Sequence, residues 1–362
     1  MSKLSQKKNL LGLSQDSLEK FFQKINEPKF RAKQLTKWVH QKGILDFDQM
    51  TDFNISLREK LKEISSLQIP KVYKSFESND GTIKYLIQLE SGSMIEMVEI
   101  PDKKRRTLCI SSQAGCALQC TFCATGAQGF DQNLSSDEII GQLWISNFYK
   151  NNKKTITNVV FMGMGEPLLN FEPVIEAAKI MKDQFAYGLS RKRITISTSG
   201  IVPNIDQLSK NIDVSLAISL HAADDNLRDE IVPINKKYPI KLLIESCRNY
   251  LMSYENKRSI TIEYILIKDI NDSLKDAAKV SKLLSNISCK INLIPFNSFK
   301  GSSYDKPSNN KIHVFKEFLM NKGFITTLRT TRGDEVSAAC GQLVGNLARP
   351  IKGKKLISHK SL

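Results

Sequence analysis

The stretch LCISSQAGCALQCTFCATG, residues 108–126, decides the fold, because it places three cysteines in one loop directly after an apolar segment. Cys116, Cys120 and Cys123 have the spacing CxxxCxxC. A closed zinc site usually takes four protein ligands in two CxxC pairs, whereas three thiolates on a 4Fe–4S cluster leave one iron open to another ligand. The spacing therefore predicts a 4Fe–4S cluster. A zinc site completed by a distant fourth ligand is the alternative.

Downstream of this loop, short apolar strands alternate with amphipathic helices. The expected strands are Thr107–Ser111, Thr157–Met162, Arg193–Thr198, Val214–Ser219, Thr261–Ile267, Lys290–Ile294 and Ile325–Arg329. Helical patterns over 136–150, 171–184, 241–254, 274–286 and 309–322 separate most of them. Such alternation favours a parallel sheet with crossover helices. Because about 230 residues is short for a complete eight-fold barrel, we predict an α/β fold with a partial (β/α)6 barrel.

Upstream of the barrel the periodicity changes twice. Apolar residues recur at three- and four-residue steps over 14–66, which predicts a small helical module. Its basic face would carry Arg31, Lys33, Lys37 and Lys42. Alternation with period two then predicts a three-stranded β meander over Val72–Glu77, Thr82–Leu89 and Met94–Ile100. We therefore divide the chain into a helical accessory domain (1–70), a β adapter (71–101), a partial barrel (102–335) and a C-terminal segment with a basic tail (336–362).

The positive charge of the chain is concentrated at its two ends. The 362 residues include 53 Lys+Arg and 37 Asp+Glu, a net charge of +16. Residues 1–72 hold 14 basic and 8 acidic residues, and residues 336–362 hold 5 basic and no acidic residues. A basic surplus often serves only solubility, but basic ends also suit a polyanion such as nucleic acid.

The sequence also predicts a cellular compartment. No apolar run approaches the length of a membrane span. The first residues, MSKLSQKKNLLGLS, lack the apolar region of a signal peptide. We therefore expect a cytoplasmic protein without membrane contact, in which the seven cysteines stay reduced.

Six motifs together resemble those of the RlmN family, the dual-specificity RNA methyltransferases of the radical S-adenosylmethionine (SAM) superfamily. They are LCISSQAGCALQCTFCATG (108–126), FMGMGEPLLN (161–170), ISTSG (196–200), AISLHA (217–222), VPINKKYPI (232–240) and AACGQL (338–343). The resemblance implies that Cys116, Cys120 and Cys123 hold a 4Fe–4S cluster and that SAM occupies its open iron. It also implies that the helical domain 1–70 takes part in binding RNA.

The resemblance further implies a SAM site at the ends of the barrel strands. The matching positions are Gly165, Glu166, Ser197, Ser219, Leu220, His221 and Asn297. This placement is physically consistent, since ligands bind at the carboxyl ends of parallel strands. Taken singly, each residue could equally be an ordinary turn or core residue.

Three further residues are implied to act in the reaction. Cys340 lies between small residues that would let a bulky group reach its sulfur, although a free Cys is usually a buried hydrophobe. The resemblance implies that Cys340 carries a methyl group and that Cys109 later forms a disulfide with it. Glu96 and Glu99 are both in phase with apolar neighbours, so the pattern alone does not choose a desolvated base. The resemblance selects Glu96, four residues before Ile100-Pro101, as the proton acceptor.

The activity implied is methylation of adenine C2 in 23S rRNA, at the peptidyl-transferase centre, and in tRNA at the adenine 3′ to the anticodon. Two SAM molecules would be used in turn. The implied partners are these RNAs and an external one-electron reductant resembling flavodoxin or ferredoxin, and we expect a monomer. Two alternatives remain: a Cfr-type enzyme, which methylates C8 of the same ribosomal adenine, and a non-catalytic RNA-binding protein with a structural zinc.

Overall fold

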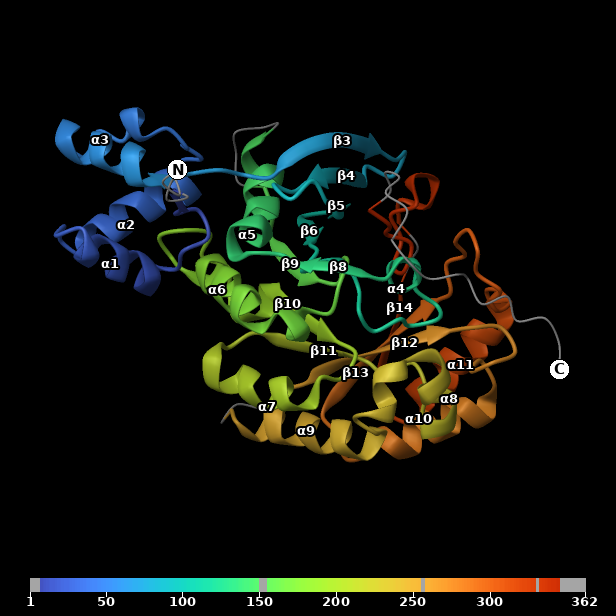
Figure 1. The fold of residues 1–362 in the computed structure, drawn as a ribbon. Helices are drawn as coiled ribbons and strands as arrows, with labels where there is room; N and C mark the ends of the chain where they lie inside the picture. Colours follow the sequence, from blue (N-terminus) through green and yellow to red (C-terminus); the bar gives the residue numbers. More distant parts are fainter. Residues whose placement is uncertain (1–6, 150–154, 255–257, 330–331, 346–362) are drawn as a thin grey trace.

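A ten-stranded sheet organises the molecule. The computed structural model describes residues 7–149, 155–254, 258–329 and 332–345. The sheet has the strand order β14-β13-β12-β11-β10-β9-β6-β5-β4-β3 (Figure 1). Its seven parallel strands are β6 (Arg105–Cys109), β9 (Asn158–Phe161), β10 (Ile194–Thr198), β11 (Ser215–Ser219), β12 (Ile260–Leu266), β13 (Cys289–Pro295) and β14 (Ile325–Leu328).

Six strand–helix units form the partial barrel, which confirms the predicted fold class. The helices between the strands are α5 (Ser136–Trp144), α6 (Phe171–Lys182), α7 (Val202–Asn211), α8 (Asp225–Ile231), α9 (Ile240–Met252), α10 (Leu274–Leu284) and α11 (Asn309–Asn321). The helices lie on the outer face of the curved sheet (Figure 1). Their apolar sides are buried, as at Val174, Ile175 and Ala178 of α6. The strand β14 follows the sixth unit at the end of the sheet.

The predicted meander is part of the same sheet. Its strands are β3 (Lys71–Glu77), β4 (Ile83–Gln88) and β5 (Met94–Asp102). They pair antiparallel in sequence, and β5 pairs antiparallel with β6, where Val98 opposes Cys109. The meander therefore extends the barrel sheet from the strand that precedes the cysteine loop.

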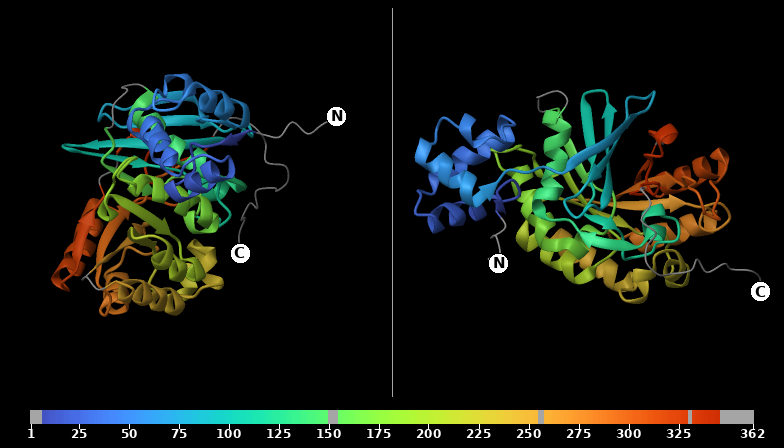
Figure 2. Two further views of the ribbon diagram at one scale, coloured as in Figure 1. Left: turned by 90° about the vertical axis from the view of Figure 1, so that its left-hand side faces the viewer. Right: turned by 45° about the horizontal axis from the view of Figure 1, so that its top comes forward.

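The N-terminal helices pack against the outside of the barrel. They are α1 (Gln15–Lys24), α2 (Phe30–Thr36) and α3 (Ile55–Ile64), and the two-residue strands β1 (Lys8–Asn9) and β2 (Ser65–Ser66) pair in parallel at their base. The backbone N–H of Ser14 donates to Glu176 of α6 (2.9 Å), and Trp144 of α5 donates to the Val39 carbonyl (3.0 Å). These helices lie at one side of the barrel and α11 with β14 at the other (Figure 2).

Several short elements lie outside the predicted pattern. The helices α7 and α8 were not predicted, nor was the hairpin of β7 (Gln113–Gly115) and β8 (Phe130–Asn133) that brackets the cysteine loop and α4 (Ala124–Gln128). Single turns of 3-10 or π-helix occupy Lys37–Gln41, Phe47–Gln49, Ile145–Tyr149, Pro167–Asn170, Arg191–Arg193, Pro233–Lys236 and Asp334–Val336. Among the described residues, no helix has the length and apolar character needed to cross a bilayer. Residues 346–362, which hold the predicted basic tail, fall outside the described residues.

Candidate functional site

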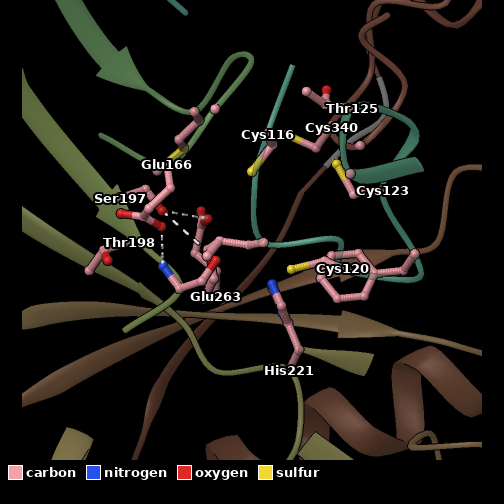
Figure 3. A pocket seen from close by; sticks show the side chains of 18 of the residues that line it. Cys116, Cys120, Cys123, Thr125, Glu166, Ser197, Thr198, His221, Glu263 and Cys340 are labelled. Carbon is pink, nitrogen blue, oxygen red and sulfur yellow. Dashed lines mark hydrogen bonds between the residues drawn. The ribbon is translucent and has the colours of Figure 1, made fainter. Parts of the chain in front are cut away.

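The three cysteines of the motif line one cavity at the mouth of the barrel. Cys116 follows β7, and Cys120 and Cys123 lie immediately before α4, with their sulfurs turned toward the cavity (Figure 3). Burial raises the pKa of the Cys116 thiol to about 12 and also raises that of Cys120. These thiols stay protonated in the bare protein, so a cationic metal centre is what would stabilise them as thiolates.

A zinc ion and a 4Fe–4S cluster make different demands on their cysteine ligands. Within the described ranges, no three His, Cys, Asp or Glu side chains converge closely enough to hold one metal ion. Zinc needs all its ligands within about 2.3 Å of one centre. In a 4Fe–4S cluster each cysteine binds a different iron, so the thiolates stand farther apart. A 4Fe–4S cluster bound by the three cysteines of the loop would leave its fourth iron open to another ligand.

The GMGEP segment enters the same cavity after β9. Gly165 has φ +94°, and a Cβ at this position would lie 2.4 Å from the Gln113 Cβ, so only glycine fits. The next residue, Glu166, is buried, and its carboxylate accepts from the backbone N–H groups of Leu168 (3.0 Å) and Ser199 (2.8 Å). Burial raises the pKa of Glu166 to about 7. A carboxylate so placed can accept a hydrogen bond from an amino group in the cavity.

The end of β11 contributes a neutral histidine. His221 lines the cavity, and its Nδ1 accepts from the Ile265 backbone N–H at 3.1 Å. Burial and the nearby Arg228 lower the pKa of His221 to about 3. The imidazole is therefore neutral with its proton on Nε2, which makes the other ring nitrogen a donor. Its ring also packs edge-on against Phe122 of the cysteine loop, with centroids 4.6 Å apart.

The remaining expected SAM residues divide into three groups. Ser197 and Ser219 line the cavity at the ends of β10 and β11, and their hydroxyls lie 3.5 Å apart. Leu220 is fully buried behind this wall and does not line the cavity. Asn297 lines a second, adjoining cavity, where its Nδ2 donates to the Cys340 carbonyl at 3.2 Å.

Cys340 connects the two cavities, because it lines both. The Gly341 carbonyl accepts from the Ala124 backbone N–H at 2.7 Å, which ties this segment to the cysteine loop. Cys109 is buried at the end of β6, and burial together with the neighbouring Cys340 raises the pKa of its thiol to about 12. All seven cysteines are free thiols in the structure, so the implied Cys109–Cys340 disulfide is not formed in it.

The two carboxylates of β5 have different surroundings. Glu96 is buried, pairs with Lys84 at 3.1 Å and accepts from the Val344 backbone N–H at 2.9 Å. Glu99 instead accepts from the Ser146 hydroxyl after α5 and pairs with Arg106. Only Glu96 contacts the segment that carries Cys340, although it lines neither cavity in this conformation.

Sequence reasoning missed three polar residues of this region. Glu263 of β12 lines both cavities, and Arg329, at the end of β14, lies 3.9 Å from it in the second cavity. Arg228 of α8 lies fully buried behind the first cavity. An acid within the apolar strand 260–266 was a signal for Glu263, but nothing local marked the two arginines.

Two family models and several known proteins match this chain. Residues 8–67 match a family described as the ribosomal RNA large subunit methyltransferase N-terminal domain, and residues 110–280 match the radical SAM superfamily. The chain is 53 % identical over 362 residues to the dual-specificity RNA methyltransferase RlmN of Pseudomonas fluorescens (strain SBW25), covering 98 % of this chain and 95 % of that protein. It is 54 % identical to the protein of the same name from Pseudomonas putida (strain W619), covering 94 % and 90 %.

A solved structure extends the similarity to three dimensions. A radical SAM methyltransferase from Sphaerobacter thermophilus superposes with a TM-score of 0.87 at 37 % identity. The match covers 94 % of this chain and all of that one.

Proposed function

The chain belongs to the RlmN family of radical SAM RNA methyltransferases, and on that premise we propose that it methylates C2 of adenine in 23S rRNA and in tRNA. The RNA targets proposed are the peptidyl-transferase centre and the adenine 3′ to the anticodon. The family is a radical SAM family, which uses a 4Fe–4S cluster and SAM as its cofactors.

One observation carries the proposal: Cys340 lines both the cavity of the cysteine loop and the second cavity. A methyl group on its sulfur would be reachable from both. The second cavity is lined by polar and basic side chains, Arg105, Asn292, Arg329 and Arg332 among them, which suits a nucleotide. An adenine in folded RNA must leave its stack to enter such a site.

The first cavity has the donors and acceptors that SAM needs. We propose that Glu166 accepts from its amino group, that Gly165 lets the backbone approach, and that His221 donates from Nε2. Ser197, Ser219 and Leu220 would form the wall around it, and Asn297 would reach it from the second cavity. When bound, the cluster and SAM supply a transferable methyl group and, after one-electron reduction, a radical that removes a hydrogen atom.

The chain's own residues then carry the methyl group. C2 of adenine is not nucleophilic, so a direct polar transfer to it would fail. We propose that the Cys340 sulfur first accepts a methyl group. After that group loses one hydrogen atom, its carbon bonds to C2 and joins the protein to the RNA covalently.

We propose that Glu96 and Cys109 act in the release of the product. The adduct gives up the C2 proton to Glu96 and one electron to an oxidant, a role that the oxidised cluster would fill. The Cys109 sulfur then bonds to the Cys340 sulfur, the bond from Cys340 sulfur to carbon breaks, and the carbon takes a proton to become the methyl group. A reductant reopens the disulfide. The proximity of the two thiols and the contact of Glu96 with Val344 support these roles.

This chemistry requires an external source of electrons. We propose a cytoplasmic monomer supplied with electrons by a flavodoxin-like or ferredoxin-like protein. We propose that residues 1–70 form an accessory domain that binds RNA beside the barrel. Residues 71–101 would form the β adapter, 102–335 the partial barrel and 336–362 the C-terminal segment with the methyl-carrying cysteine.

Digestion of modified RNA tests the proposal. After incubation of the reconstituted enzyme with unmodified 23S rRNA or tRNA, mass spectrometry of the nucleosides should show 2-methyladenosine. Finding 8-methyladenosine instead would support the Cfr-type alternative. A colourless zinc protein that leaves both RNAs unchanged would support the non-catalytic alternative.

A further inference from the structure

The turn after β11 has an unusual backbone. The Leu220 N–H donates to the Ile218 carbonyl at 3.0 Å and the Ala222 N–H donates to the Leu220 carbonyl at 2.8 Å, so two hydrogen bonds span only two residues each. His221, the central residue of the second hydrogen bond, has φ +60°, which a residue with a side chain rarely adopts. Such a conformation persists only where its surroundings hold it.

Three groups hold this turn: the Glu263 carbonyl accepts from the Leu220 N–H at 3.0 Å, the Asn271 Nδ2 donates to the His221 carbonyl at 2.9 Å, and Arg228 of α8 donates to two further carbonyls. The Arg228 side chain is fully buried. Its Nε donates to the Leu220 carbonyl at 2.9 Å, and its Nη2 donates to the carbonyls of Ser219 at 3.1 Å and Ser199 at 2.7 Å. These carbonyls follow two neighbouring strands, β10 and β11. One planar guanidinium therefore joins both turns in a fixed geometry, which a lysine could not reproduce.

The charge of Arg228 is directed at these carbonyls. Its Nη1 donates to the Asn235 Oδ1 at 2.8 Å, and the Asn235 Nδ2 donates to Asp225 (2.8 Å) and Asp229 (2.7 Å). Asn235 thus stands between the guanidinium and these two carboxylates. Hydrogen bonds from a buried cation are stronger than neutral ones, so the three carbonyls are held firmly.

Two of the three residues whose carbonyls Arg228 holds, Ser199 and Ser219, form part of the wall of the first cavity, and Leu220 directly precedes a third residue of that wall, His221. Arg228 itself lies behind these residues and does not line the cavity. The helix α8 also contacts the cysteine loop, because the Thr121 N–H donates to the Ile231 carbonyl at 3.2 Å. Arg228 is therefore built into the support between the cluster loop and the strand ends.

We infer that Arg228 is a positioning residue for SAM, whose guanidinium fork holds the turns after β10 and β11 in the shape that forms the wall of the binding cavity. The inference rests on the proposed function only in taking this cavity as the SAM site. It predicts that loss of the fork weakens SAM binding while the three cysteines still hold the cluster.

The variant Arg228→Lys tests it, since lysine keeps the charge and the buried stem but cannot bridge three carbonyls. SAM binding to the cluster-loaded protein is measured by equilibrium dialysis. Iron content, cluster absorbance and the thermal midpoint are measured alongside it. The Kd for SAM should rise about tenfold or more, as when a supporting residue behind a ligand site is lost, with iron content unchanged. A Kd within twofold of the wild type, with a lowered thermal midpoint, would overturn the inference.

Arg258→Lys is the matched control. Arg258 also forms a two-pronged contact, to Asp213 at 2.6 and 3.2 Å, but this contact precedes β11 at its opposite end. Its loss should lower the thermal midpoint without changing the Kd for SAM. An equal rise of the Kd in both variants would show that general loosening of β11 is the cause, and would also overturn the inference.

Two more variants complete the test. Glu166→Gln should weaken SAM binding if the cavity is the SAM site. If Glu166→Gln raises the Kd for SAM and Arg228→Lys does not, the inference about Arg228 fails while the cavity remains the SAM site. If neither variant changes the Kd, the site assignment fails as well. Should Arg228→Lys lose its cluster, Asn235→Ala removes the Nη1 partner and the amide that separates the guanidinium from Asp225 and Asp229, while Arg228 keeps its own donors to the three carbonyls. It should raise the Kd about two- to fivefold. An unchanged Kd in that variant would contradict the inference.

Discussion

Two buried acids on β5 show how partners decide a role that sequence pattern leaves open. Glu96 and Glu99 both lie among apolar neighbours, and both are buried. Glu99 is held by Arg106 and Ser146 on the side of α5, away from Cys340. Burial raises the pKa of Glu96, while Lys84 and the Val344 N–H counteract that rise. Glu96, which contacts the segment that carries Cys340, is thus the carboxylate whose pKa is set by burial, Lys84 and the Val344 N–H.

Lys84→Met should shift the pH dependence of product release. The Lys84 ammonium lowers the pKa of Glu96, so its removal raises that pKa, and the ionised base is then lost at a higher pH. In single-turnover experiments over a pH series, the acidic limb of the release rate should move to higher pH.

Lys74→Met on the neighbouring strand β3 is the control, because Lys74 is exposed and lies over the Phe76 ring. Its pH profile should match that of the wild type. If the acidic limb of Lys84→Met does not move, Glu96 does not accept the proton under the influence of Lys84.

At the scale of elements, the turn after β9 depends on a glycine for two separate reasons. Gly165 has φ +94°, and an added Cβ would also lie 2.4 Å from the Gln113 Cβ and 2.8 Å from its backbone nitrogen. Gly92, in the turn between β4 and β5, has a similar φ of +86° but nothing within 4 Å of an added Cβ. Replacing Gly92 by alanine therefore tests backbone strain alone, whereas replacing Gly165 tests backbone strain and crowding together.

Gly165→Ala should therefore cost more stability than Gly92→Ala. The left-handed backbone alone costs about 1 kcal/mol, and crowding should bring the Gly165 variant to about 3 kcal/mol or more. Denaturant unfolding of both variants measures the two free energies. Equal losses would mean that the turn after β9 relaxes freely, and that Gly165 is not required by its packing on Gln113.

The rhythm of strands and helices was predictable because long apolar segments repeat along the chain. Shorter elements were not. The helix α8 has only seven residues, and the hairpin β7–β8 joins three- and four-residue strands with polar residues such as Gln113 and Asn133. Elements this short do not complete a hydrophobic period.

The candidate site was predictable only where family motifs carried it. Cys116, Cys120 and Cys123 stand out in the sequence, and the structure brings them to one cavity with Cys340. Arg228 could not be found that way, because two of its carbonyl partners, Ser199 and Ser219, lie 29 and 9 residues from it. Buried polar residues gain their roles from distant segments.

At the scale of the whole molecule, the basic N-terminal module is docked on the barrel and part of its charge is used internally. Lys33 lies 3.9 Å from the centre of the Phe185 ring, and Lys42 lies 3.2 Å from that of Trp38. Arg31 donates to the Asp52 carbonyl at 2.8 Å. We therefore expect many basic residues of the module each to contribute a little to RNA binding, with no single residue dominating.

RNA binding and SAM cleavage should respond differently to salt. RNA binding by basic surfaces releases counterions and weakens steeply as salt rises, whereas SAM cleavage in a buried cavity does not. RNA affinity and RNA-independent formation of 5′-deoxyadenosine are measured over one salt series. Affinity should fall steeply while cleavage stays nearly constant. Parallel loss of both would contradict this division between a basic exterior and a buried reaction site.

In the proposed reaction the methyl group reaches adenine through Cys340 and loses a hydrogen atom on the way. The direct measurement uses SAM with a fully deuterated methyl group, over enough turnovers to replace methyl groups already on the protein, followed by mass spectrometry of 2-methyladenosine. The product should carry a methyl group with two deuterium atoms and one hydrogen from solvent. A product that keeps all three deuterium atoms would show direct transfer and contradict the role of Cys340.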